Sequence, residues 1–214
     1  LKNKYNAKNE RSWKLRFHTQ TAGCSLTAQQ PEINIARTSF QALAGVLGGT
    51  QSLHTNSMDE TLALPSEKAA EIALRTQQLI AYETGVANVV DPLGGSFFIE
   101  QLTDKIEERA EEYFSEIEVL GGVINAIEDG YFQREIARSA SDYQTKIDSK
   151  RRIVVGVNDY INKDQEIDIP LLEINSNIEK KQINNLINLK KNRDSQNVQN
   201  ALFNIKEACK SDTN

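Results

Sequence analysis

The hydrophobic and polar positions of the first 85 residues predict two strand-then-helix units. Bulky apolar and basic side chains alternate from Trp13 to Phe17, which is typical of a strand with one buried face. Apolar residues at helical spacing predict a helix from Pro31 to about Leu47, followed by a second strand at about Thr50 to His54 and a second helix between Pro65 and Gly85. Because strands that alternate with helices pair in parallel, this pattern predicts an α/β fold.

The remainder of the chain predicts helices. A long amphipathic helix is expected from Phe98 to Leu120, and shorter ones near Val123 to Asp129 and Gln133 to Asp148. Residues Arg151 to Asn158 contain a run of branched apolar side chains and are the one later strand candidate. Two further helices are expected around these apolar positions: Ile178, Ile183, Leu186, Ile187 and Leu189 for the first, and Val198, Leu202, Ile205 and Ala208 for the second. We therefore divide the chain into residues 1–85, the strand–helix units, and residues 86–214, a mainly helical extension.

Composition narrows the class of protein. The chain has 214 residues, 39% hydrophobic and 26% charged, with a net charge of −5, which describes an ordinary soluble globular protein. Nucleic acid is not an expected partner, because binding phosphates requires a basic face. The apolar runs fall far short of the roughly 20 residues that cross a bilayer, so no membrane association is expected.

The cysteines indicate the cellular compartment, and the first residues indicate whether the chain is part of a longer protein. Cys24 and Cys209 are too few and too far apart for a disulfide framework or a metal knuckle, which favours a cytoplasmic location. Residues 1–9 have neither an initiating Met nor the apolar core of a signal peptide. We expect the chain to begin inside a larger protein.

Candidate chemistry gathers where the two predicted strands end. His18 and His54 each follow a predicted strand, and parallel pairing would bring both to one rim. Asn56 and Glu60 follow in a polar loop, where a carboxylate and an amide suit the vicinal hydroxyls of a ribose. Asp59 or Glu60 could equally serve as a cap of the next helix. No ligand spacing typical of zinc occurs, so no metal site is expected in this chain.

Several long, non-repetitive segments resemble the methylmalonyl-CoA mutase family of acyl-CoA mutases, in its catalytic subunit. They are Arg16-Phe17-His18-Thr19-Gln20-Thr21-Ala22-Gly23, Ser25-Leu26-Thr27-Ala28-Gln29, Gly49-Thr50-Gln51-Ser52-Leu53-His54-Thr55-Asn56-Ser57-Met58-Asp59-Glu60, Asp91-Pro92-Leu93-Gly94-Gly95-Ser96 and Ile153-Val154-Val155-Gly156-Val157-Asn158. The resemblance extends over nearly the whole chain and is looser after about residue 160.

The resemblance implies an adenosylcobalamin-dependent rearrangement of the carbon skeleton of a CoA thioester. It implies a (β/α)8 TIM barrel, of which residues 1–85 would form only the last two units. By resemblance, His18 is the catalytic candidate and faces the corrin with Gln20, while Gly23 allows close backbone approach. The remaining cofactor residues are Asn56 and Glu60, which hold the ribose of the adenosyl group, and Ala63 beside it.

Some residues depart from the family pattern, and these departures bear on which substrate and which partner subunit are expected. Cys24 stands where methylmalonyl-specific members often have Trp, Glu71-Ile72-Ala73-Leu74-Arg75 replaces Arg-Ile-Ala-Arg-Asn, and Ile33-Asn34 replaces a paired Asn. The chain has no Asp-x-His-x-x-Gly segment to ligate cobalt, so a separate cobalamin-binding domain or small subunit, and hence a hetero-oligomer, is expected. The expected reaction interconverts (R)-methylmalonyl-CoA and succinyl-CoA. Isobutyryl-, 2-hydroxyisobutyryl- or ethylmalonyl-CoA remain alternatives, as does an inactive helical docking fragment, and the chain by itself is expected to be inactive.

Overall fold

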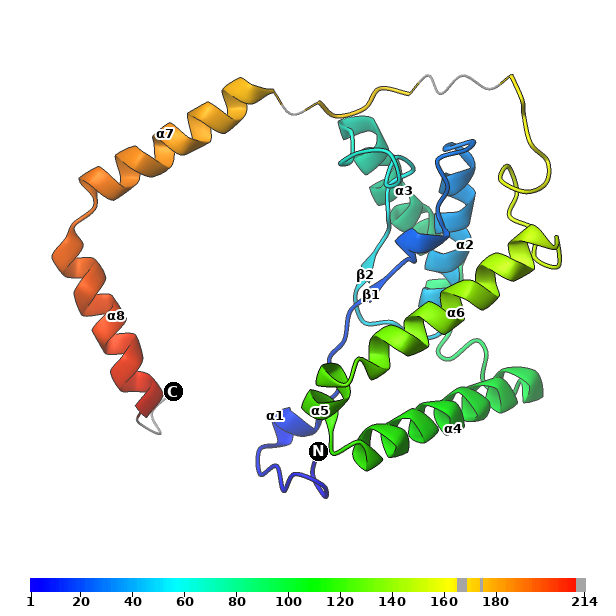
Figure 1. The fold of residues 1–214 in the computed structure, drawn as a ribbon, viewed down its shortest axis with the longest axis horizontal. Helices are drawn as coiled ribbons and strands as arrows, with labels where there is room; N and C mark the ends of the chain where they lie inside the picture. Colours follow the sequence, from blue (N-terminus) through cyan, green and yellow to red (C-terminus); the bar gives the residue numbers. More distant parts are fainter. Residues whose placement is uncertain (165–168, 174, 211–214) are drawn as a thin grey trace. The chain divides into compact units, whose positions relative to one another are not determined.

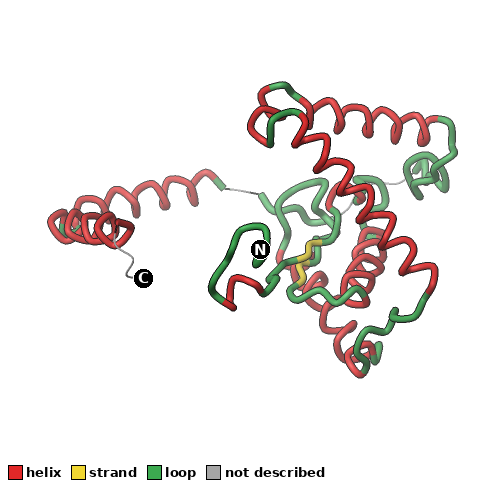
Figure 2. Tube along the Cα trace, turned by 90° about the horizontal axis from the view of Figure 1, so that it is seen from below, coloured by secondary structure: helices red, strands yellow, loops and turns green. Residues whose placement is uncertain are grey.

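The chain forms two compact units, Leu1–Leu171 and Leu172–Asn214. The computed structural model describes residues 1–164, 169–173 and 175–210 (Figure 1). Helices dominate these ranges, with a small parallel sheet in the first unit (Figure 2). None of the helices in the described ranges is long and apolar enough to span a bilayer.

The first unit is built around two short parallel strands. Strand β1, Thr19–Gln20, pairs with β2, Leu53–His54, with Thr19 opposite Leu53 and Gln20 opposite His54. Helix α2, Ile33–Leu47, connects them and packs against helix α3, Glu67–Glu83 (Figure 1). The predicted α/β class, parallel pairing and both helices are confirmed. The barrel and the division at residue 85 remain predictions.

The first predicted strand was wrong in position. Residues Glu10–Trp13 form a short helix, α1, in which the Asn9 side chain accepts from Arg11 N at 2.9 Å. The Trp13 indole nitrogen donates to Ala7 O at 2.6 Å, which keeps that side chain in the local turn. Pairing begins only at Thr19, so His18 precedes β1 and does not follow it. Local side-chain hydrogen bonds outcompete the strand that alternation alone predicts.

The predicted strand from Arg151 to Asn158 was also wrong. Asn158 Oδ1 accepts from Val154 N at 2.7 Å, and Asn158 Nδ2 donates to Ile147 O at 2.8 Å. These bonds fold the segment into a turn after α6, Tyr131–Asp148, with one isolated bridge between Val155 and Asp159. An Asn side chain that binds nearby backbone groups competes with a strand for them.

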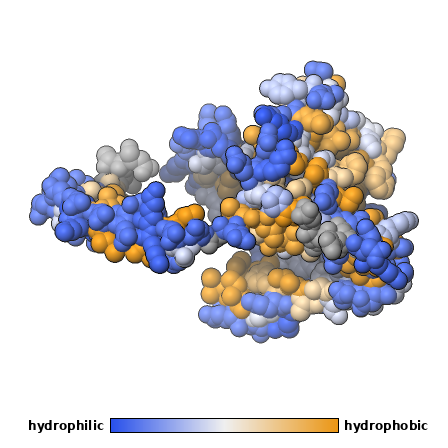
Figure 3. Space-filling model, turned by 90° about the horizontal axis from the view of Figure 1, so that it is seen from above, coloured by the Kyte–Doolittle hydropathy of each residue, from blue (hydrophilic) through white to orange (hydrophobic). Residues whose placement is uncertain are grey.

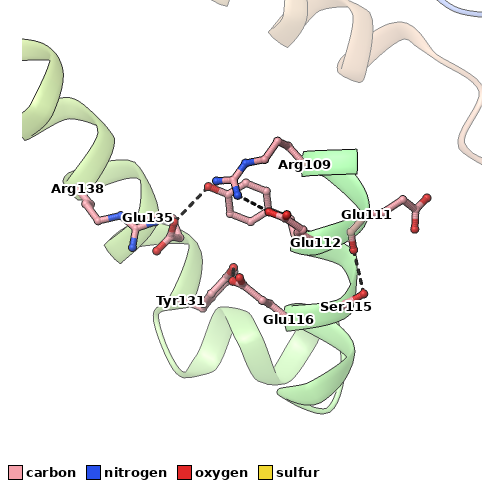
Figure 4. A network of polar contacts seen from close by, with 9 residues as sticks. Arg109, Glu111, Glu112, Ser115, Glu116, Tyr131, Glu135 and Arg138 are labelled. Atoms are coloured by element: carbon pink, nitrogen blue, oxygen red, sulfur yellow. Dashed lines mark hydrogen bonds and ion pairs between the residues drawn. The ribbon is translucent and has the colours of Figure 1, made fainter. Parts of the chain in front are cut away.

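Three α-helices follow α3 in the described part of the first unit. Helix α4 spans Phe97–Val119, α5 spans Val123–Glu128 and α6 begins at Tyr131, two residues before the predicted start at Gln133. Polar side chains join α4 to α6: the Tyr113 hydroxyl donates to Glu135 at 3.2 Å, and the Tyr131 hydroxyl donates to Glu116 (Figure 4). The three predicted helices are confirmed.

The described residues of the second unit contain two helices, each of which begins at a polar cap. Helix α7 spans Ser176–Asn192 and α8 spans Ser195–Lys210, which confirms both predicted helices. Asp194 accepts from the backbone of Gln196 at 2.8 Å and so starts α8. Apolar side chains reach the surface in both units (Figure 3), and they include Phe40 and Phe97 in the first and Phe203 in the second.

Candidate functional site

The parallel pairing of β1 and β2 brings together the loops that follow them. After β1 the chain makes a short 3-10 turn at Gly23–Ser25, and after β2 it forms the polar loop from Thr55 to Ser66. In this loop Asn56 and Asp59 are buried, whereas Glu60 is exposed. The two loops therefore form one cluster at the carboxyl ends of adjacent strands.

Asn56 is held from the β1 side with one of its polar atoms left over. Its backbone N–H donates to Thr21 Oγ1 at 2.9 Å, and the Thr21 hydroxyl donates back to Asn56 Oδ1 at 2.7 Å. Gln20 Nε2 reaches the same oxygen at 3.5 Å. Asn56 Nδ2 is buried and has no hydrogen-bond partner among the described residues. A buried donor without a partner costs free energy, so this atom is suited to an incoming acceptor.

Gly23 lies directly against Asn56 and Glu60. A Cβ atom at this position would lie 3.0 Å from Asn56 Nδ2 and 3.6 Å from Glu60 Oε1. The missing side chain therefore leaves half-buried backbone beside an amide donor and a carboxylate acceptor. The structure thus brings together three of the residues that the sequence singles out, from two loops about 35 residues apart in the chain.

Gln41 fixes the turn that contains Gly23, and the sequence analysis missed it. Its Oε1 accepts from Ala22 N at 2.6 Å, and its Nε2 donates to Ser25 Oγ at 2.6 Å. The Ser25 hydroxyl in turn donates to Ala22 O at 2.6 Å. A polar residue in the middle of α2, four positions after the polar Arg37, was the only signal in the sequence.

Asp59 has a structural role at the start of α3. It is fully buried, and its Oδ2 accepts from Ser66 N at 2.8 Å, while Ser66 Oγ caps the helix through Ala69 N at 3.3 Å. Burial raises the pKa of Asp59, but the nearby Ser57 hydroxyl and the Ser66 amide outweigh it, so the pKa lies below 3.8. Asp59 therefore holds the cap residue Ser66 rather than capping α3 itself, and Glu60 presents an exposed carboxylate.

The two histidines do not meet at one rim. His54 lies opposite Gln20 in the sheet and, with Glu60, lines a cavity of about 240 Å³. His18 precedes β1 and is exposed, and its Nδ1 lies 2.6 Å from Ser52 Oγ. The expectation of adjacent imidazoles failed because the strand starts where it was predicted to end. In the ranges that the structure describes, no three His, Cys, Asp or Glu side chains could jointly hold a metal ion.

Ala63 lies at the far end of the polar loop and is half-buried. Its backbone N–H donates to Asp59 O at 3.1 Å, next to the bond from Leu62 N to the same oxygen at 2.8 Å. The segment after Glu60 is thus a tight turn whose carbonyl acceptor belongs to the buried Asp59.

Comparison with known proteins gives one consistent family. Residues 1–214 match the family model described as methylmalonyl-CoA mutase. The chain is 41% identical over 213 residues to the 2-hydroxyisobutanoyl-CoA mutase large subunit of Aquincola tertiaricarbonis, a match that covers 100% of this chain and 38% of that protein.

Two methylmalonyl-CoA mutases show similar identity. The large subunit from Porphyromonas gingivalis is 44% identical over 200 residues, covering 92% of this chain and 28% of that protein. The human mitochondrial enzyme is 40% identical over 208 residues, a match that covers 97% of this chain and 28% of that protein. The chain therefore spans between 28% and 38% of the length of these three relatives.

Proposed function

This chain belongs to the methylmalonyl-CoA mutase family, and we propose from that premise that it is part of the catalytic subunit of an adenosylcobalamin-dependent acyl-CoA mutase. In this proposal residues 1–85 contribute the last two strand–helix units of a (β/α)8 barrel. The cluster of Gly23, Asn56 and Glu60 then lies on the rim where such barrels bind their ligands.

The observation that carries the proposal is the unpaired Asn56 Nδ2 beside Gly23 and Glu60. A ribose presents two neighbouring hydroxyls, each of which can both donate and accept. One hydroxyl can accept a hydrogen bond from Asn56 Nδ2, and the ionised Glu60 carboxylate can accept hydrogen bonds that the hydroxyls donate. The residues present therefore fit the nucleoside of adenosylcobalamin, and Gly23 has no side chain that would displace Asn56 or Glu60.

The remaining candidates act around this cluster. We place His18 and Gln20 toward the corrin, with the His18 ring oriented by its contact with Ser52 Oγ and the Gln20 side chain by Asn56 Oδ1. Ala63 lies beside the ribose. His18 is the proposed catalytic residue, because its second ring nitrogen is available for a hydrogen bond at the reacting face.

Bound adenosylcobalamin would supply the radical chemistry of the rearrangement through cleavage of its cobalt–carbon bond. The chain's own contribution is to orient the nucleoside through Asn56 and Glu60. Three large parts of the assembly lie outside this chain: the remaining barrel strands, a cobalamin-binding domain or small subunit, and most of the acyl-CoA site. We propose a hetero-oligomer, and we place it in the cytoplasm, because Cys24 and Cys209 are both free thiols.

Two substrates are proposed. The first is (R)-methylmalonyl-CoA, interconverted with succinyl-CoA. The second is 2-hydroxyisobutyryl-CoA, favoured by a relative so named that matches the whole chain and by Cys24 in place of Trp. Assays of the full-length protein with each thioester would separate them.

The binding role is tested with Glu60→Gln in the full-length protein assembled with its cobalamin-binding domain or subunit. Losing charge-assisted hydrogen bonds should weaken binding of adenosylcobalamin by about tenfold to a hundredfold, whereas hydroxocobalamin, which lacks the adenosyl group, should bind as before. Glu67→Gln, which removes an exposed carboxylate from the first turn of α3, is the matched control. Unchanged adenosylcobalamin affinity in Glu60→Gln would refute the assignment.

A further inference from the structure

Asn34 joins the two loops of the candidate site. It is fully buried in the first turn of α2, and its Nδ2 donates to Thr27 O at 2.8 Å and to Met58 O at 2.9 Å. Its Oδ1 accepts from Thr27 N at 3.1 Å and from Arg37 Nη1 at 2.8 Å. A side-chain amide has two N–H groups and two lone pairs, so Asn34 uses all of its bonding capacity. One side chain therefore fixes the loop after β1 to the loop after β2.

Arg37 extends this network to a distant segment. It lies one turn after Asn34, and its Nη1 also donates to Thr27 Oγ1 at 2.9 Å. Its Nη2 donates to Val155 O at 2.7 Å, 118 residues along the chain. Gln30 Nε2 makes a second connection, to Tyr160 O at 3.0 Å. A planar guanidinium can serve several acceptors at once, so Arg37 ties the turn after α6 to the amide of Asn34.

Met58, whose carbonyl accepts from Asn34 Nδ2, lies midway in the sequence between the two proposed ribose ligands. Asn56 precedes it by two residues and Glu60 follows it by two. The loop beyond it is closed by the bonds from Leu62 N and Ala63 N to Asp59 O. Displacement of Met58 would therefore move both ligands and loosen the turn that follows.

We propose that Asn34 and Arg37 are positioning residues: they hold Met58, and through it Asn56 and Glu60, in the geometry that binds the nucleoside. The Val155 carbonyl sets where the guanidinium lies. The ligand in this inference rests on the proposed function. Neither positioning residue touches the nucleoside, and both act through the loop backbone.

The test is amide hydrogen exchange of the ligand-free, full-length protein carrying Arg37→Gln. Exchange at Leu62 and Ala63 should accelerate about tenfold, since a lost charge-assisted hydrogen bond is worth roughly that factor, while α2 and α3 exchange as in the parent. Arg37→Lys should behave in the same way, because an ammonium group does not reproduce the planar fork. Arg75→Gln is the matched control: this exposed arginine lies on α3 and contacts two side chains of the same helix, Gln78 at 2.6 Å and Glu71 at 3.7 Å.

A second readout is cofactor affinity. Arg37→Gln should weaken the binding of adenosylcobalamin about tenfold and leave the binding of hydroxocobalamin unchanged. Unchanged exchange in the loop would overturn the positioning role, and so would equal acceleration across α2 and α3, which indicates lost stability alone.

The two proposals fail in different ways. If loop exchange accelerates in Arg37→Gln but neither this variant nor Glu60→Gln changes adenosylcobalamin affinity, the network positions the loop and the nucleoside assignment is wrong. If Glu60→Gln weakens binding and Arg37→Gln changes neither readout, the nucleoside assignment stands and the positioning role is wrong.

Discussion

The polar side chains around β1 and β2 and those of helices α4 to α6 make opposite kinds of contact. In the first region, buried or half-buried side chains join residues far apart: Thr21 to Asn56 over 35 positions, Asn34 to Met58 over 24, and Gln41 to Ser25 over 16. In the second, most polar contacts join exposed neighbours three to five residues apart, such as Arg109 with Glu112 (Figure 4) and Arg134 with Asp129.

This difference indicates what each region does. Long-range bonds between buried groups specify a single arrangement, because each unpaired group would cost free energy. Contacts within one helix surface are solvated and contribute little. The loops after the strands are therefore held in one arrangement by contacts across the fold, whereas the polar surface of α4 to α6 supports individual helices.

We expect the largest effect from removing Asn34, the side chain at the centre of the long-range hydrogen bonds around β1 and β2. Asn34→Leu leaves Met58 O, both Thr27 backbone groups and one Arg37 donor without their partner. We expect the free energy of unfolding to fall by more than about 3 kcal/mol, measured by urea denaturation of the full-length protein.

An Asn-to-Leu substitution in the helices α4 to α6 serves as the comparison for Asn34→Leu. Asn125 on α5 is exposed, and its Nδ2 donates to Gly121 O in its own turn at 3.2 Å. Asn125→Leu should leave stability close to that of the parent. Equal losses in the two variants would contradict the comparison.

A smaller effect is expected from Asp59, whose contribution to stability depends on pH. Because the pKa of Asp59 is lowered below 3.8 on folding, its stabilising contribution is complete above about pH 4 and is lost as the pH falls through the lower, folded value. Asp59→Asn keeps the shape but not the charge, so it should cost about 1 kcal/mol at neutral pH. Urea denaturation across acidic pH should show the variant and parent converging, and a constant difference would count against the assigned role of Asp59.

The smallest effect concerns the surface network. The Tyr131 hydroxyl donates to Glu116, and this carboxylate raises the pKa of Tyr131 to about 12. Any stabilisation from the pair is therefore present below pH 10.0 and lost as the pH rises through about 12. Glu116→Gln should move the phenolate titration, followed by ultraviolet absorbance, back toward 10.0 without changing stability at neutral pH. An unmoved titration would show that Glu116 is not the cause.

The helices could be predicted from the sequence because their signals are local. Periodic apolar positions and terminal glycines give α2 and α4 without reference to the rest of the chain. The strands were harder, because β1 and β2 are two residues each and exist only through their mutual pairing. Alternation placed the first strand at Trp13 to Phe17, but the helix α1 ends at Trp13 and pairing begins only at Thr19.

The site could be predicted only where a residue's own chemistry identified it. Asn56 and Glu60 stood out because they follow a predicted strand, and the structure brings Gly23 to them. Asn34, Arg37 and Gln41 did not stand out, since their roles depend on loops up to 118 residues away. A helix residue whose partner is a distant backbone carbonyl has no local sequence pattern.

The central claim is that Gly23, Asn56 and Glu60 receive a nucleoside. A structure of the full-length protein with adenosylcobalamin tests it most directly. We predict a ribose hydroxyl within hydrogen-bond distance of Asn56 Nδ2, a second hydroxyl bonded to the Glu60 carboxylate, and the Gly23 backbone against the sugar. A bound cofactor whose adenosyl group contacts none of these three residues would contradict the account.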